Sequence, residues 1–219
     1  MRRLQIRPDR IRLPLVLAFF AALWLAPAQA APVRILAFGD SLTAAYGLSP
    51  GQGFVEQLAS ELKVQGYDAV IENAGVSGDT SAAGLARLDW ALSSNPQIVM
   101  LELGANDALR GLPPADTARN LDAMLTKLAA RKIKVLFLGM KAPPNLGPEY
   151  GDEFNAIFPR LAKAHGVAFY PFVLEGVAAN PSLNQADGIH PNAEGAKIMA
   201  HQILPYLLPL VKAAEHDGA

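Results

Sequence analysis

A serine, an aspartate and a histidine with the chemistry of a nucleophilic triad occur in two short stretches of the sequence. Ser41 follows Gly39-Asp40, whereas Asp187 and His190 lie together in Asp187-Gly-Ile-His190. A serine hydroxyl is a poor nucleophile unless a neighbouring base takes its proton, and an imidazole is suited to that task near neutral pH. A spacing of three residues allows the Asp187 carboxylate to reach the imidazole and fix its tautomer. These residue types predict acyl transfer through Ser41 if the fold brings the two stretches together.

Such a reaction also needs fixed hydrogen-bond donors, because it passes through an anionic tetrahedral intermediate. The side-chain amide of Asn106 is one candidate donor. The backbone N–H groups of Ser41 and Gly75 are two others, since a glycine has no side chain to obstruct a close approach. We therefore expect an oxyanion hole formed by Ser41, Gly75 and Asn106.

Alternating apolar runs and helical patterns predict the elements that position these residues. Short apolar runs typical of strands span residues 33–38, 67–72, 98–103, 133–138 and 167–170. Helical spacing of apolar residues covers 54–65, 80–93, 115–131, 149–165 and 193–208. This alternation is typical of a doubly wound α/β domain with a mostly parallel sheet.

In such a sheet all strands point the same way, because strand–helix–strand crossovers are right-handed. Ser41 follows the first predicted strand, Gly75 the second, Asn106 the third, and the Asp187–His190 pair comes after the fifth. All of these residues are therefore expected at one edge of the sheet. We expect the aspartates that follow strands, Asp40 and Asp107, to cap the turns after them, and Thr80 to cap the next helix.

The first 30 residues have the pattern of an export signal. Five arginines precede an uncharged run at 13–25, and Ala28-Gln-Ala30 offers a cleavage site between small residues. The run is shorter than the roughly 20 residues that a membrane-spanning helix needs. We expect residues 1–30 to be a signal peptide and 31–219 to form a single domain. The mature protein should then be periplasmic or secreted, with no stable membrane anchor.

Composition narrows the function classes further. Removing residues 1–30 leaves 14 basic and 19 acidic residues, which changes the net charge from −1 to −5 and argues against a nucleic-acid partner. The chain has no cysteine, so thiolate nucleophiles and thiolate metal sites are excluded. The remaining histidines, His165, His201 and His216, do not form a metal-ligand pattern, and we expect no metal site. No serine stands in the Gly-x-Ser-x-Gly pattern of the common α/β-hydrolases.

Several blocks in this order resemble the SGNH (GDSL) hydrolase family, namely Gly39-Asp-Ser-Leu42, Gly75, Gly104-Ala-Asn-Asp107 and Asp187-Gly-Ile-His190. Segments 73–80, 84–88 and 101–107 are similar to the bacterial periplasmic acyl-thioesterase/lysophospholipase and arylesterase group. The resemblance covers residues 33–210. It implies a flavodoxin-like three-layer α/β/α fold with five parallel strands in the order 2-1-3-4-5, the triad and oxyanion hole given above, and no metal or organic cofactor. Ala105 departs from the glycine that close relatives often have.

The resemblance also implies what the enzyme acts on. Its substrate would be a small-molecule or lipid acyl ester, including aryl and short or medium acyl esters, acyl thioesters and lysophospholipids. We expect the acyl groove to be lined by Leu109, Leu112, Pro143 and Leu146, and the protein to act as a monomer. Two alternatives stay open, an O-deacetylase of carbohydrates or glycans with the same triad, and a non-catalytic periplasmic binding module.

Overall fold

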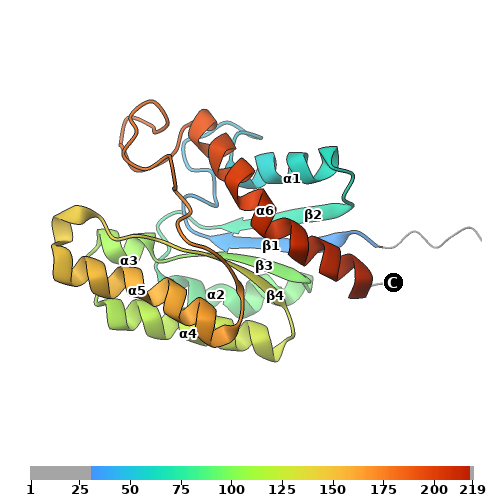
Figure 1. The fold of residues 1–219 in the computed structure, drawn as a ribbon, viewed down its shortest axis with the longest axis horizontal. Helices are drawn as coiled ribbons and strands as arrows, with labels where there is room; N and C mark the ends of the chain where they lie inside the picture. The colour runs from blue at the N-terminus through green and yellow to red at the C-terminus, as the bar shows by residue number, and fades with distance from the viewer. Residues whose placement is uncertain (1–30, 218–219) are drawn as a thin grey trace, which may run out of the picture.

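A five-stranded parallel sheet forms the centre of the structure, a computed structural model that describes residues 31–217 (Figure 1). The strand order is β2-β1-β3-β4-β5, as predicted, and every pair of neighbours is parallel. The strands are β1 (Val33–Gly39), β2 (Ala69–Gly75), β3 (Ile98–Glu102), β4 (Lys134–Leu138) and β5 (Ala168–Tyr170). The predicted signal peptide, residues 1–30, lies outside the described residues. Within the described part of the chain, no helix is both long and apolar enough to cross a membrane.

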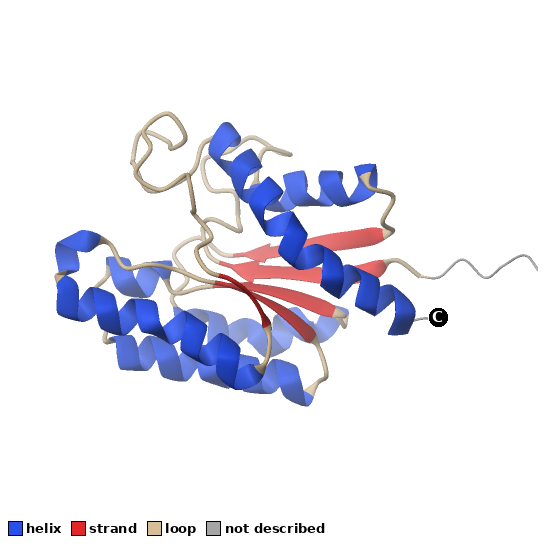
Figure 2. Cartoon of the chain, viewed as in Figure 1, coloured by secondary structure: helices blue, strands red, loops and turns tan. Residues whose placement is uncertain are grey.

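Helices cover both faces of the sheet and complete three layers (Figure 2). One face carries α1 (Phe54–Val64) and α6 (Ala193–Asp217), which pack against each other. The other carries α2 (Ser81–Ala91), α4 (Pro114–Ala130) and α5 (Pro148–His165), with α4 between its two neighbours. Shorter elements are the 3₁₀ turn η1 (Leu92–Ser94), the helix α3 (Ala105–Leu109) and the 3₁₀ turn η2 (Pro144–Leu146).

The core lies on both sides of the two central strands. All five residues of β3 are buried, and β1 is buried from Ile35 onward. This burial explains why these strands read as continuous apolar runs rather than as alternating patterns. Phe137 of β4 contacts Phe158 of α5, and Phe154 packs beside Phe158, so α5 is fixed to the sheet through aromatic rings. Each fully buried side chain of this size contributes about 2 kcal/mol through the hydrophobic effect.

The elements differ from the predicted ones at three places. Strand β2 starts and ends later than predicted, at Ala69 and Gly75, because it pairs with β1 as far as Gly39. The segment after β3 forms the helix α3 instead of a plain turn. Helix α6 continues beyond residue 208 and through Pro205 and Pro209. The buried residues at 207, 211 and 214 compensate for the hydrogen bonds that the prolines remove.

The carboxyl ends of the strands meet at one edge of the sheet, where the arrowheads of Figure 2 point into a group of loops. The turn after β1, the loop 76–80 after β2 and helix α3 after β3 lie there. The loop 139–147 after β4 and the long link 171–192 after β5 join them. This edge is where open parallel sheets place their ligand sites.

Candidate active site

The two stretches with triad chemistry meet at this edge. His190 Nε2 lies 2.9 Å from Ser41 Oγ, although 149 positions separate the residues in the sequence. His190 Nδ1 lies 2.7 Å from Asp187 Oδ2. The hydroxyl, the imidazole and the carboxylate therefore form one continuous chain of hydrogen bonds, in which the imidazole can accept the serine proton and the carboxylate can stabilise the imidazolium.

Local hydrogen bonds hold the loop that carries the aspartate and the histidine. Asp187 Oδ1 accepts the backbone N–H groups of Ile189 and His190, each at 3.0 Å. The imidazole hydrogen bond, aided by these N–H groups, lowers the pKa of Asp187 to about 2. The carboxylate is therefore ionised throughout the neutral range, as an orienting group for a general base must be.

The turn that carries the nucleophile is tightly bonded. Asp40 Oδ1 accepts the N–H of Leu42 at 3.1 Å, so Asp40 caps this turn as predicted. The carbonyl of Ser41 accepts the N–H of Tyr46 at 3.0 Å. The ring of Tyr46 packs against the imidazole of His190 with 4.7 Å between ring centroids. The N–H of Ser41 makes no hydrogen bond within residues 31–217, which leaves it as a donor for a substrate.

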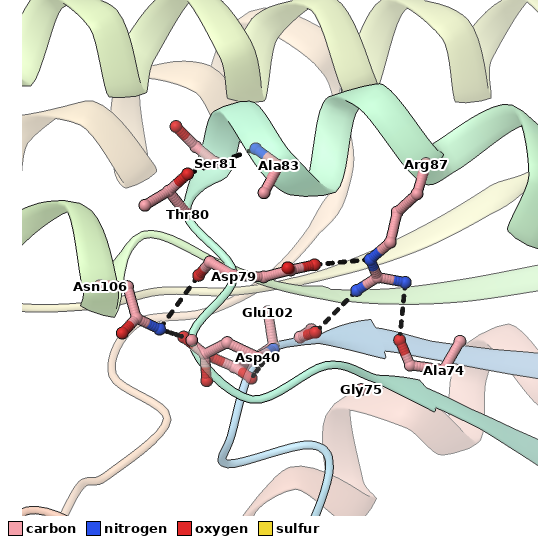
Figure 3. A network of polar contacts seen from close by, with 12 residues as sticks. Asp40, Ala74, Gly75, Asp79, Thr80, Ser81, Ala83, Arg87, Glu102 and Asn106 are labelled. Carbon is pink, nitrogen blue, oxygen red and sulfur yellow. Dashed lines mark hydrogen bonds and ion pairs between the residues drawn. The ribbon is translucent and has the colours of Figure 1, made fainter.

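Asn106 lies in the first turn of α3, close to the nucleophile turn (Figure 3). Its Nδ2 donates to Asp40 Oδ2 at 3.1 Å and to the carbonyl of Asp79 at 3.0 Å. Both amide protons therefore have protein acceptors, and donation to an oxyanion requires Asn106 to share one of them. This arrangement fixes the amide in place before any substrate binds.

Gly75, by contrast, is not a free donor. Its N–H donates to Asn73 Oδ1 at 2.9 Å, and a side chain here would collide with the backbone of Ala44. Gly75 therefore serves close packing of the β2 end. Three residues later, Gly78 has φ +88° and an N–H without an acceptor among the described residues. It directly precedes Asp79, whose carbonyl contacts Asn106, so Gly78 is the better candidate donor.

Arg87 of α2 anchors the loop 76–80 that follows β2. No role was assigned to this arginine from the sequence. Its guanidinium pairs with Asp79 and donates to the carbonyls of Ala74 and Gly39, each at 2.9 Å (Figure 3). It also lies over the ring of Phe38, 4.0 Å from the centroid. Arg87 thus connects the ends of β1 and β2 to the loop beside Asn106.

The two remaining capping predictions have different outcomes. Thr80 caps α2 as predicted, because its hydroxyl accepts the N–H of Ala83 at 3.3 Å. Asp107 does not cap the turn after its own strand. Its buried carboxylate accepts the N–H and the hydroxyl of Ser81 and the hydroxyl of Thr117, so it joins α3 to α2 and α4. The distant partners explain why the sequence did not reveal them.

A pocket of about 440 Å³ opens beside Ser41 and His190. Its walls are mostly apolar, which suits an acyl chain. Two of the four residues expected at an acyl groove, Leu109 and Pro143, are among the lining residues, whereas Leu112 and Leu146 are not. Further lining residues that the sequence did not single out are Met140, Phe172, Leu174 and Ile189.

Comparison with known proteins identifies the family. The model of the GDSL-like Lipase/Acylhydrolase family matches residues 37–198. The chain is 43% identical to Esterase TesA of Pseudomonas aeruginosa over 90% of this chain and 98% of that protein. It is 36% identical to Arylesterase of Vibrio mimicus, covering 90% and 100%. It is 39% identical to Thioesterase 1/protease 1/lysophospholipase L1 of Escherichia coli, covering 86% and 88%.

Solved structures agree with this result. The crystal structure of TesA superposes with a TM-score of 0.78 at 44% identity, over 81% of this chain and 99% of that one. The psychrotrophic esterase EstA from Pseudoalteromonas sp., inhibited by monoethylphosphonate, gives a TM-score of 0.78 at 32% identity, over 82% and 99%. The chain is therefore an ester hydrolase that belongs to the GDSL-like lipase/acylhydrolase family.

Proposed function

We propose that this protein is an exported serine hydrolase that cleaves carboxylic esters through an acyl-enzyme intermediate. The observation that carries the proposal is the hydrogen-bonded chain Ser41–His190–Asp187, which opens into an apolar pocket. A non-catalytic binding module would have no need for a base within 2.9 Å of a serine hydroxyl.

In the first half of the proposed reaction, Ser41 Oγ attacks the acyl carbon while its proton passes to His190 Nε2. Asp187 stabilises the imidazolium that forms. The tetrahedral intermediate then collapses, the bond to the leaving oxygen breaks, and His190 returns the proton to that oxygen. In the second half, water attacks the acyl-enzyme, again through His190, and releases the carboxylic acid and free Ser41.

The negative charge of the tetrahedral intermediate would be stabilised by fixed N–H donors. The proposed donors are the backbone N–H groups of Ser41 and Gly78 and the side-chain amide of Asn106. Support comes from the Ser41 and Gly78 N–H groups, which have no acceptor within the described part of the chain, and from the position of Asn106 against the nucleophile turn. Such preorganised donors contribute about 3–4 kcal/mol each when they are removed singly in other hydrolases.

The apolar pocket favours an acyl chain over a polar sugar, which supports ester cleavage rather than glycan deacetylation. Names of the relatives, among them an arylesterase and a thioesterase/lysophospholipase, support aryl esters, acyl thioesters and lysophospholipids as further substrates. Leu109 and Pro143 would contact the acyl chain. Export would depend on the signal-like residues 1–30.

A fluorophosphonate probe tests the nucleophile. We expect the protein of residues 31–219 to be labelled covalently and to hydrolyse p-nitrophenyl acyl esters, and Ser41→Ala to lose both properties. Ser60→Ala is the matched control, because Ser60 is exposed on α1. Folded wild-type protein that neither reacts with the probe nor hydrolyses any ester would refute the proposal. A panel of aryl acetates, longer esters, acyl-CoA, lysophospholipid and acetylated sugars would then rank the substrate classes.

A further inference from the structure

Two carboxyl groups are buried together beneath the nucleophile turn. Asp40, the residue directly after β1, has no exposed surface, and Glu102, the last residue of β3, is 1% exposed. Two adjacent carboxylates that are buried in the core repel each other, so a pair of this kind retains a proton. The reaction proposed above assigns no role to Glu102.

The hydrogen bonds show which of the two holds the proton. Both oxygens of Asp40 accept N–H groups, Oδ1 from Leu42 and Oδ2 from Asn106, each at 3.1 Å. Glu102 accepts at one oxygen only, where Oε2 faces the Thr43 hydroxyl at 2.8 Å and the Asp40 N–H at 3.3 Å. Its other oxygen, Oε1, is buried and faces no donor among the described residues. The proton therefore belongs on Glu102.

The electrostatic environment also favours a proton on Glu102. Burial, together with the charge of Asp40, raises the pKa of Glu102 well above its usual value. Burial also raises the pKa of Asp40, to about 6. The Asp40 N–H donates to Glu102 Oε2 at 3.3 Å, so the two residues are in direct contact. The titratable side chains near Asp40 include His190 and the Arg87–Asp79 ion pair, whose arginine binds the carbonyl of Gly39.

We propose that Glu102 is a positioning residue for ester hydrolysis, a neutral carboxylic acid that accepts the Asp40 N–H and so keeps the Asp40 carboxylate between Leu42 and Asn106. Asp40 connects the nucleophile turn to the Asn106 amide, and Glu102 accepts the backbone N–H of Asp40 (Figure 3). Glu102 touches no reacting atom. The inference rests on the proposed function, because it needs Asn106 to act in the oxyanion hole.

Three variants separate this role from a merely structural one. Glu102→Gln can keep both hydrogen bonds, because its amide oxygen can accept the Asp40 N–H and the Thr43 hydroxyl. We therefore expect it to retain at least about a third of wild-type kcat. Glu102→Leu removes both, and kcat should fall about 10- to 100-fold with KM within about twofold. Asp40→Asn should lose at least as much as Glu102→Leu, because an amide cannot accept at both of its heavy atoms.

Thermal unfolding provides a second measurement that does not depend on activity. Glu102 is neutral in the folded protein but ionises in the unfolded chain above its ordinary pKa of 4.5, so its contribution to wild-type stability decreases as pH rises from about 5 upward. Glutamine does not titrate. The Tm of Glu102→Gln minus that of wild type should therefore increase by about 2 °C or more over this range.

The outcomes that contradict the inference are distinct. A Glu102→Gln variant as impaired as Glu102→Leu would show that the reaction needs an ionised carboxylate. A folded Glu102→Leu variant with wild-type kcat would remove the positioning role. If Glu102→Leu does not fold, a Tm difference that stays flat with pH still overturns the neutral acid. Wild-type protein that hydrolyses no ester would instead refute the proposed function, whatever the Tm difference shows.

Discussion

Two histidine–carboxylate pairs in this protein have almost the same geometry but different surroundings. His190 lies 2.7 Å from Asp187 at the sheet edge, and His165 lies 2.7 Å from Asp122 between α5 and α4. Both histidine side chains are 16% exposed. A carboxylate-bound imidazole is therefore not sufficient to mark an active site, and the difference lies in what faces the second ring nitrogen.

Three features distinguish the His190 pair. The other nitrogen of its imidazole faces the Ser41 hydroxyl, and both residues line the apolar pocket. The proposed oxyanion donor Asn106 lines the same pocket as Ser41. Finally, Gln185 ties the loop of His190 to the nucleophile turn, donating to the carbonyl of Tyr46 at 2.7 Å and to that of Pro191 at 2.9 Å. Each feature can be removed separately.

The largest expected effect comes from removing the imidazoles one at a time. His190→Ala should lower kcat by roughly 10⁴-fold or more, because Ser41 loses its base. His165→Ala should leave kcat unchanged, because His165 contacts Asp122 between α5 and α4 and does not line the pocket. Steady-state kinetics on a p-nitrophenyl ester, with circular dichroism to verify folding, measures both. Equal losses in the two variants would contradict the triad.

An intermediate effect is expected from the oxyanion amide. Asn106→Ala should reduce kcat by about 10²- to 10³-fold with a small change in KM, since the donor acts mainly in the transition state. Asn120→Ala is a suitable control, because the amide of Asn120 donates to Ser81 and does not line the pocket. A loss of less than about tenfold would show that the Ser41 and Gly78 N–H groups suffice without Asn106.

The sequence predicted those parts of the site whose interactions are local. Asp187 and His190 are three positions apart, so their contact follows from the loop itself. The sequence indicated Gly75 as the glycine donor and did not single out Gly78, although in the structure the Gly75 N–H donates to Asn73 Oδ1. The two glycines differ because β2 pairs with β1 as far as Gly75, which brings Gly75 against Ala44. This pairing depends on strand register, which is a long-range property of the fold.

Buried polar networks were the least predictable part. A glutamate at the end of the apolar run 98–103 is a visible irregularity, because an ionised side chain is rarely buried without a partner. Its partner Asp40, however, is 62 positions away, and only the arrangement of β1 beside β3 brings the two together. Similarly, the prolines of α6 favour a break in the helix, but the packing of α6 on the sheet keeps the helix continuous.

The smallest expected effect tests how firmly the two stretches are held together. Gln185→Ala removes two hydrogen bonds to backbone carbonyls, which together contribute about 1–3 kcal/mol. Without these hydrogen bonds the loop that carries His190 is held less firmly against the nucleophile turn. We therefore expect kcat to fall about three- to tenfold. Gln65→Ala, at the exposed end of α1, is the matched control. Activity that stays at the wild-type level would show that the Asp187 carboxylate alone, through its bonds to Ile189 and His190, holds the imidazole against Ser41.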